Sequence, residues 1–124
     1  MREAKRDEGW VKKQIKNRLS KYPHLHWWMP NAGAFGVSGQ HDFMICQMGV
    51  FWSIEAKYGT NTPTDNQITF AKRIREAGGF CLMVNEKNLD EVDRVATYID
   101  RMIGNVEDDI GHDFSIWRKN ASTK

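Results

Sequence analysis

Two acidic residues and one lysine stand at the ends of two short apolar segments near the middle of the chain. Asp42 directly precedes the apolar segment 43–46, and Glu55 and Lys57 belong to the segment 50–57. The segment 50–57 is rich in β-branched and aromatic residues and lies between glycines, which predicts a β-strand. Side chains alternate along a strand, so Glu55 and Lys57 share one face. The short turn Gln47-Met48-Gly49 joins the two segments and predicts an antiparallel hairpin, which brings Asp42 back beside Glu55 and Lys57.

Two carboxylates that converge on one point repel each other unless a cation lies between them. Hard oxygen ligands of this kind suit Mg²⁺ or Mn²⁺, and a phosphodiester would supply the remaining ligands. A neighbouring lysine could then orient or deprotonate the attacking water, or stabilise charge in the transition state. The pattern therefore predicts a metal-dependent nuclease. The alternative is a solvated Glu55–Lys57 ion pair, because Glu-x-Lys is a common sequence and such pairs contribute little to stability.

A third carboxylate is expected from an amphipathic helix at the start of the chain. The pattern predicts a helix from about Arg2 to Lys21, with Glu8 on its apolar stripe. The stripe is formed by Ala4, Val11, Ile15 and Leu19. Glu8 would point inward and complete the metal site, with Glu3 as the second choice. The alternative is an acidic residue at the edge of the stripe, paired with Lys5 or Lys12 at helical spacing.

A glutamine on a second apolar helical stripe is the next candidate. Thr62 followed by Pro63 predicts a helix start, and the pair Gly78–Gly79 predicts its end. The stripe of this helix is formed by Phe70, Ala71, Ile74 and Ala77. Gln67 lies on the same stripe one turn earlier. Its amide either satisfies open backbone groups of a neighbouring strand or contacts the metal site.

The remaining apolar segments predict the rest of an α/β fold. Residues 25–29 and 80–84 are expected to form the first and last strands, and Asn88 is expected to cap a final helix that ends at Gly104. The buried stripe of that helix is formed by Leu89, Val92, Ala96, Ile99 and Ile103. The strand–helix–strand passage from Glu55 to residues 80–84 predicts a right-handed crossover with parallel strands. The order is α-β-β-β-α-β-α, a mixed sheet flanked by helices.

Taken in order, these features resemble the VRR-NUC group of the PD-(D/E)xK nuclease superfamily. The resemblance covers roughly residues 3 to 103, and it rests on Glu8, the glycine-containing loop 31–39, Asp42, Glu55-Ala56-Lys57, Gln67 and the segment 78–84. It implies a restriction-endonuclease-like α-β-β-β-α-β core that binds one or two divalent cations. The stand-alone members of the group are similar to structure-specific endonucleases of phages and bacteria.

The resemblance also assigns expected roles to single residues. The catalytic positions of the family fall on Asp42, Glu55, Lys57 and Gln67. Its metal ligands fall on Asp42, Glu55 and, by position in the first helix, Glu8. His41 stands where the family usually has proline, a residue that shapes the turn and is not a ligand. The change therefore affects the expected loop geometry and leaves the expected chemistry intact.

Length and composition set further expectations. A chain of 124 residues holds one domain, here residues 1–104, followed by a tail, residues 105–124. No membrane span or cleavable leader is visible, so we expect a soluble intracellular protein, and the resemblance implies the cytoplasm of a bacterium or a phage-infected host cell. Cys46 and Cys81 are expected to be core thiols without a disulfide or zinc. The loop 33–39 lacks the lysine of a P-loop, so no nucleotide cofactor is expected.

The charge is unevenly distributed, although the net charge is only +2. Residues 1–21 carry eight Lys or Arg and three acidic residues, whereas residues 85–113 carry three and nine. A basic first helix would bind nucleic acid in a salt-sensitive manner, with a weaker patch on the middle helix. The expected phosphate contacts are Lys5, Lys12, Lys13, Lys16, Lys72 and Arg73. The alternative is a merely solvated helix face.

The tail and the exposed aromatic residues bear on assembly. Acidic residues at 107–113 could hold a metal but are more typical of a linker, and the apolar cluster 114–117 could dock on its own domain or on a partner. Trp27, Trp28 and Trp117, with the resemblance, favour a homodimer that prefers branched DNA such as four-way junctions. A non-catalytic nucleic-acid-binding or assembly protein with the same fold is the alternative, and the complete acid–lysine set argues for the enzyme.

Overall fold

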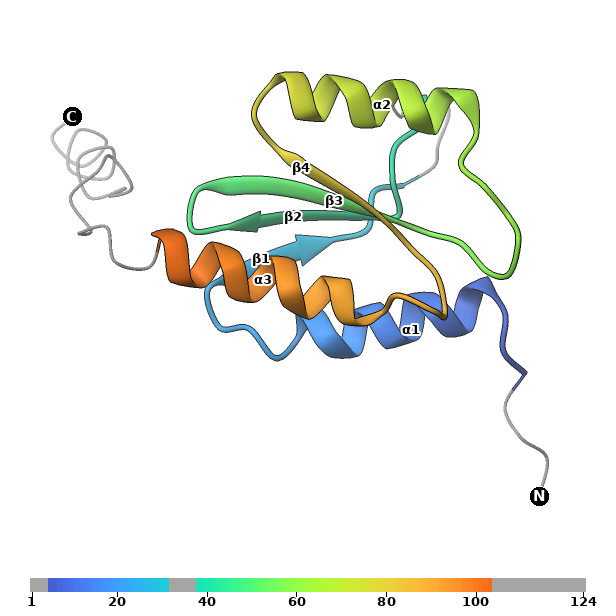
Figure 1. The fold of residues 1–124 in the computed structure, drawn as a ribbon, viewed down its shortest axis with the longest axis horizontal. Coiled ribbons are helices and arrows are strands. Elements are labelled where there is room, and N and C mark those ends of the chain that lie inside the picture. Colours follow the sequence, from blue (N-terminus) through green and yellow to red (C-terminus); the bar gives the residue numbers. More distant parts are fainter. Residues whose placement is uncertain (1–4, 32–37, 104–124) are drawn as a thin grey trace, which may run out of the picture.

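A four-stranded mixed sheet with helices on both faces organises the part of the chain that the structure describes, residues 5–31 and 38–103 of the computed structural model. The elements in order are α1 (Glu8–Leu19), β1 (Leu25–Trp28), β2 (Phe43–Gln47), β3 (Val50–Ala56), α2 (Asp65–Glu76), β4 (Phe80–Val84) and α3 (Asp90–Ile103). In the sheet the strands follow the order β1-β2-β3-β4. One face is covered by α2 and the other by α1 and α3 (Figure 1). The predicted α/β fold with a flanked mixed sheet is confirmed.

Several predictions concern residues outside the described ranges. These are Glu3, Ala4, most of the loop 31–39, Gly104 and the tail 105–124 with its acidic and aromatic residues. Within the described ranges, no helix is both long and apolar enough to cross a membrane.

The predicted hairpin is present and fixes the register of Asp42. β2 pairs antiparallel with β3, with Phe43 opposite Ile54, so Asp42 lies next to Glu55 just beyond the ladder. The connecting residues Met48 and Gly49 both have positive φ, 51° and 81°. This is the backbone of a two-residue type I′ turn, whose twist matches that of paired strands. β3 and β4 are parallel, as the crossover through α2 predicts.

Gln47 was expected in the hairpin turn, and this expectation is wrong. Gln47 is the last residue of β2, pairs with Val50 and is fully buried. Its amide nitrogen donates to the Ala96 carbonyl and to Asp100 Oδ1, at 2.8 and 2.9 Å. These partners on α3 satisfy the amide nitrogen, whereas Gln47 Oε1 is buried without a hydrogen-bond partner among the described residues.

The dry core lies between the sheet and the layer of α1 and α3. The expected stripes are buried there at Val11, Ile15 and Leu19 of α1 and at Val92, Ala96 and Ile99 of α3, while Leu89 is half-buried; the facing side chains of β2 and β3 are buried as well. The core residues are Val11, Ile15, Leu19, Phe43, Ile45, Trp52, Ile54, Ala56, Val84, Val92, Ala96 and Ile99. The two helices are also tied by polar contacts, because Asp93 of α3 accepts hydrogen bonds from Tyr22 and Arg18.

The opposite face is less completely covered, and α2 has no fully buried residue. Its expected stripe is half-buried at Phe70, Ala71 and Ile74 and exposed at Ala77, which corrects the predicted burial. The helix is capped by Thr64, two residues later than predicted. Thr64 Oγ1 accepts the Gln67 N–H at 3.2 Å and Gln67 Oε1 accepts the Thr64 N–H at 2.9 Å. This reciprocal capping box determines the start of α2.

Three other local predictions are corrected. The first helix begins at Glu8 and not near Arg2, because Asp7 caps it by accepting the Trp10 N–H at 2.9 Å. Asn88 does not cap α3. Its side chain holds the preceding loop, accepting from Asn85 N–H at 2.7 Å and donating to the Met83 carbonyl at 3.0 Å. Cys46, expected in the core, is an exposed free thiol on β2.

Trp27 was grouped with the exposed aromatic residues, but it is half-buried. Its ring packs on Phe43 with 5.7 Å between the ring centroids. Trp28, the next residue of β1, is 41% exposed, as the alternation of a strand requires.

Candidate active site

The carboxylates of Asp42 and Glu55 lie next to each other at one end of the β2–β3 hairpin. Asp42 directly precedes β2, and Glu55 is the sixth residue of β3, on the face that α2 covers. The negative charge of Asp42 is close enough to contribute to raising the pKa of Glu55. The structure also brings Lys57 and Gln67 into contact with Glu55. Four of the predicted site residues therefore meet at this point.

Glu55 is an acid buried to 4% exposure with an incomplete set of partners. Its Oε2 accepts from Gln67 Nε2 at 3.1 Å and forms an ion pair with Lys57 Nζ at 3.2 Å. Its Oε1 is buried and has no hydrogen-bond partner. Burial above all, and then the charge of Asp42, raise the pKa of Glu55 to about 7, while Lys57 acts in the opposite direction. A cation at Oε1 would remove this penalty.

Asp42 is held by the backbone of the neighbouring strand and by a lysine from the other helical layer. Its Oδ2 accepts the Ala56 N–H at 2.9 Å, which orients the carboxylate along the end of β3. Its Oδ1 forms an ion pair with Lys12 Nζ at 3.3 Å. Lys12 was predicted as a phosphate contact of α1 or as a partner of Glu8. In the structure it partly neutralises the candidate metal ligand.

Gln67 has two roles, and the structure decides between the two alternatives for it. The side chain contacts the candidate site through Nε2 and caps its own helix through Oε1. It satisfies no backbone group of a neighbouring strand among these contacts. Because one planar amide makes both bonds, the start of α2 and the orientation of Glu55 are coupled.

His41 was expected only to change the geometry of the loop before Asp42, but it connects three parts of the site. Its ring is 4% exposed and packs edge-on against Phe70, with 4.9 Å between the ring centroids. Nε2 is 3.0 Å from the Gln67 carbonyl and Nδ1 is 2.8 Å from Ser53 Oγ. A carbonyl only accepts, so Nε2 carries the proton, and in the neutral ring Nδ1 is an acceptor for the hydroxyl of Ser53, whose Oγ also lies 3.3 Å from Cys81 Sγ. Burial lowers the pKa of His41, which favours this neutral form.

The loop that delivers His41 passes very close to the start of α2. Gly39 has φ of +77°, and a Cβ atom there would lie 2.2 Å from the Asn66 carbonyl oxygen. No other residue type fits this conformation and this contact. The sequence pattern could not predict the contacts of His41, Ser53 and Lys12, because each contact joins residues of different elements that are far apart in the sequence.

Two carboxylates, one with a buried partnerless oxygen, form a donor set that suits a small divalent cation. Mg²⁺ is commonly held by one or two carboxylates together with water and substrate phosphate. Within residues 5–31 and 38–103, no three His, Cys, Asp or Glu side chains group closely enough to hold a metal. Glu8, the first residue of α1, is half-buried and does not complete such a group. The residues present fit a cation held by Asp42 and Glu55.

The other predicted phosphate contacts are exposed and lie on two layers. Lys5, Lys13 and Lys16 belong to or precede α1, and Lys72 and Arg73 belong to α2. These helices cover opposite faces of the sheet (Figure 1), so the two patches do not form one continuous plane. The candidate site lies at the strand ends, where it contacts α1 through Lys12 and α2 through Gln67.

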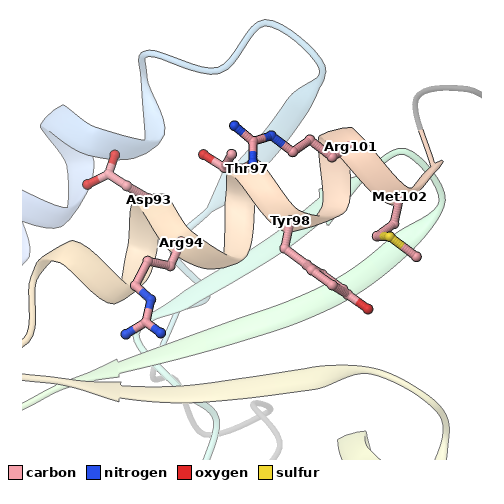
Figure 2. A pocket seen from close by; sticks show the side chains of 6 residues that line it. All are labelled: Asp93, Arg94, Thr97, Tyr98, Arg101 and Met102. Atoms are coloured by element: carbon pink, nitrogen blue, oxygen red, sulfur yellow. The ribbon is translucent and has the colours of Figure 1, made fainter.

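A hollow of about 440 Å³ lies on the surface of α3, away from the Asp42–Glu55 pair. Figure 2 shows that its six lining residues all come from this one helix, among them Arg94, Tyr98 and Arg101. It contains one carboxylate, Asp93, which is already bonded to Arg18 and Tyr22. The residues around this hollow therefore do not form a set of reactive groups.

No family model matches the chain, and no curated protein matches it. The assignment to the VRR-NUC group therefore remains a prediction.

Proposed function

We propose that this protein is a divalent-metal-dependent endodeoxyribonuclease that hydrolyses phosphodiester bonds at the Asp42–Glu55 pair. One observation carries the proposal: Glu55 is a buried carboxylate beside a second carboxylate, and one of its oxygens has no partner. Such an arrangement is costly unless a cation is bound there. The ion-paired Lys57 at 3.2 Å adds a group able to act on a bound phosphate.

Each residue of the site has a distinct role in this proposal. Asp42 and Glu55 would hold Mg²⁺ or Mn²⁺, which when bound polarises the phosphate and lowers the pKa of a water. Gln67 keeps Glu55 oriented through its 3.1 Å hydrogen bond. Lys57 would orient the attacking water or stabilise the charge that develops on the phosphoryl oxygens. Lys12 would move from Asp42 towards the phosphate when a cation binds.

The substrate and the assembly follow from less direct observations. The exposed lysines of α1 support sequence-independent, salt-sensitive binding to DNA. Action on branched DNA, a homodimer and a cytoplasmic location are proposed from the resemblance. A two-fold dimer would place two identical sites in antiparallel relation, as cuts in two strands require.

Cleavage assays test the proposal directly. Labelled single-stranded, duplex, flap and four-way-junction DNA are incubated with the protein, with and without Mg²⁺ or Mn²⁺. We expect metal-dependent cleavage that Asp42→Asn abolishes and that Glu76→Gln leaves intact. Glu76 is an exposed acid of α2, so it controls for the change of charge alone. Cleavage that persists unchanged in purified Asp42→Asn would overturn the site assignment.

A non-catalytic nucleic-acid-binding or assembly protein is the second candidate. The ion pairs Lys12–Asp42 and Lys57–Glu55 favour it, because they neutralise both carboxylates without a metal. This candidate predicts DNA binding that is indifferent to Mg²⁺ and no cleavage of any of the four substrates.

A further inference from the structure

A half-open cavity of about 200 Å³ lies between α2 and the strands β3 and β4, and Glu55 forms part of its wall. Gln67, which donates to Glu55, lines it as well. The cavity is therefore continuous with the proposed active site. Met83 is the register partner of Glu55 in the β3–β4 ladder and continues the wall beyond the carboxylate.

Most of the cavity wall is apolar, and its mouth is open to solvent. The apolar lining comes from Pro63, Ile68, Ala71, Leu82 and Met83. Ile68 is 42% exposed and Met83 is 40% exposed, although both are large apolar side chains. Arg75, one further turn along α2 from Ala71, adds a guanidinium to the lining. A flat group with an apolar face and a nearby negative charge fits this combination.

We infer that the cavity receives an unpaired nucleobase of the nucleotide next to the scissile phosphate. This inference rests on the proposed nuclease function and names the substrate class of that site. A phosphodiester held at Asp42 and Glu55 necessarily carries a base on each side, and the cavity begins at Glu55 itself. The base packs between the Ile68 and Met83 side chains, and Arg75 stacks on it or pairs with the next phosphate.

A base in a regular duplex cannot reach the cavity without leaving its partner. Extruding it costs a few kcal/mol, and the cost is least for a base that is already unpaired. The cavity therefore favours DNA with an unpaired nucleotide at the cut, such as single strands and the branch points of flaps or junctions. It supplies a physical basis for a preference that the basic helix α1 cannot provide, because phosphate contacts do not distinguish these substrates.

The test uses single-stranded oligonucleotides and the full chain. The position of the cut is mapped with Mg²⁺, and the base on either side of it is then removed or replaced by 2-aminopurine. We expect removal of one flanking base to lower kcat/KM roughly tenfold, within the range measured for stacked bases, and removal several nucleotides away to have no effect. With Ca²⁺ in place of Mg²⁺, 2-aminopurine at the same position should become brighter as it leaves its stacked neighbours.

Two variants at the mouth connect the effect to the cavity. Ile68→Ala and Met83→Ala should reduce both the fluorescence increase and the penalty for the missing base. Phe80→Ala is the matched control, because Phe80 is a 41% exposed residue of β4 that does not line the cavity. Equal cleavage of intact and abasic oligonucleotides would overturn the inference while leaving the nuclease proposal in place. Absence of cleavage on every substrate would overturn the proposed function, and the inference with it.

Discussion

The two faces of the sheet differ sharply, although the same strand contributes to both. On the face of α1 and α3, β3 presents Trp52, Ile54 and Ala56, all fully buried among apolar side chains. On the face of α2, the alternate residues Ser53 and Glu55 are also buried, but among polar partners. The first face supplies hydrophobic stabilisation.

The α2 face is organised by hydrogen bonds. Gln67 caps α2 and donates a hydrogen bond to Glu55 of β3. His41 lies within hydrogen-bond distance of the Gln67 carbonyl of α2 and of Ser53 of β3. Among the described residues, Glu55 is the buried acid with a partnerless oxygen, and it lies here, whereas the partnerless buried atoms of the opposite face, Gln47 Oε1 and Trp52 Nε1, are uncharged. If the proposed function holds, stability and reactivity lie on opposite faces of one strand, and changes on one face should leave the other largely intact.

The largest expected effect is on activity, at Lys57. Replacing it with methionine keeps the length of the side chain and removes the charge, and we expect cleavage to fall about 10²- to 10⁴-fold, as for loss of a group that acts on protons or charge at the reaction centre. Because Lys57 lowers the pKa of Glu55, its loss raises that pKa, and we expect metal binding to persist at pH 9, well above the wild-type value of about 7. Kinetic assays and calorimetry measure the two quantities. Lys87→Met, at an exposed lysine, is the control, and lost metal binding in Lys57→Met would contradict the assigned role.

The next effect is on stability, at Trp52. Truncation to alanine in the dry core should lower the free energy of unfolding by about 3–5 kcal/mol. Phe51→Ala is the matched control from the adjacent, half-buried position on the α2 face, and it should cost clearly less. Urea titration followed by circular dichroism measures both. Similar losses for the two variants would contradict the division between the faces.

A third effect is the dependence of stability on pH without metal. The folded pKa of Glu55 is about 7, above its ordinary value of 4.5, so the folded state binds the extra proton between these values. Stability should therefore fall as pH rises from 4.5 to 7 and then level off, by about 3 kcal/mol at most. His41, whose pKa is lowered, changes stability in the opposite direction, since its contribution is lost as pH falls below 6.5.

The difference between wild type and Glu55→Gln isolates the contribution of the acid. Urea titrations at several pH values should show the decline in wild type and not in Glu55→Gln. Parallel curves for the two proteins would show that Glu55 does not titrate in this range.

The smallest effect separates helix capping from orientation of Glu55. Gln67→Leu and Thr64→Ala each break the capping box and should each cost about 1 kcal/mol. Only Gln67→Leu also removes the hydrogen bond to Glu55, so only this variant should weaken metal binding and cleavage. Thermal denaturation and metal titration of both variants provide the comparison. Equal activity in the two would show that Gln67 acts only as a cap.

The arrangement of β3 could be predicted because its pattern is local. Alternation alone places Glu55 and Lys57 on the face of the strand opposite to that of Trp52. The short turn alone predicts the hairpin that brings Asp42 next to Glu55. Helix starts were less predictable, because Thr62 and Thr64 are both suitable caps. Thr64 is the cap because Gln67, three residues later, accepts a hydrogen bond from the Thr64 N–H and donates its own N–H to Thr64 Oγ1.

The long-range polar contacts could not be read from the sequence. Lys12 looks like any other lysine of a basic helix until the packing of α1 brings it to Asp42. Likewise His41 and Ser53 are 12 positions apart, and no spacing rule pairs them across two elements. Such contacts depend on tertiary packing, which local sequence patterns do not determine.

The most direct test of the central claim is a calorimetric titration of Mn²⁺ into the metal-free protein at pH 8. We predict that wild type binds the cation and that Asp42→Asn and Glu55→Gln each lose most of this affinity, while the charge control Glu76→Gln retains it. Binding of equal strength in wild type and in both site variants would show that the cation is held elsewhere and that the Asp42–Glu55 pair is not the metal site.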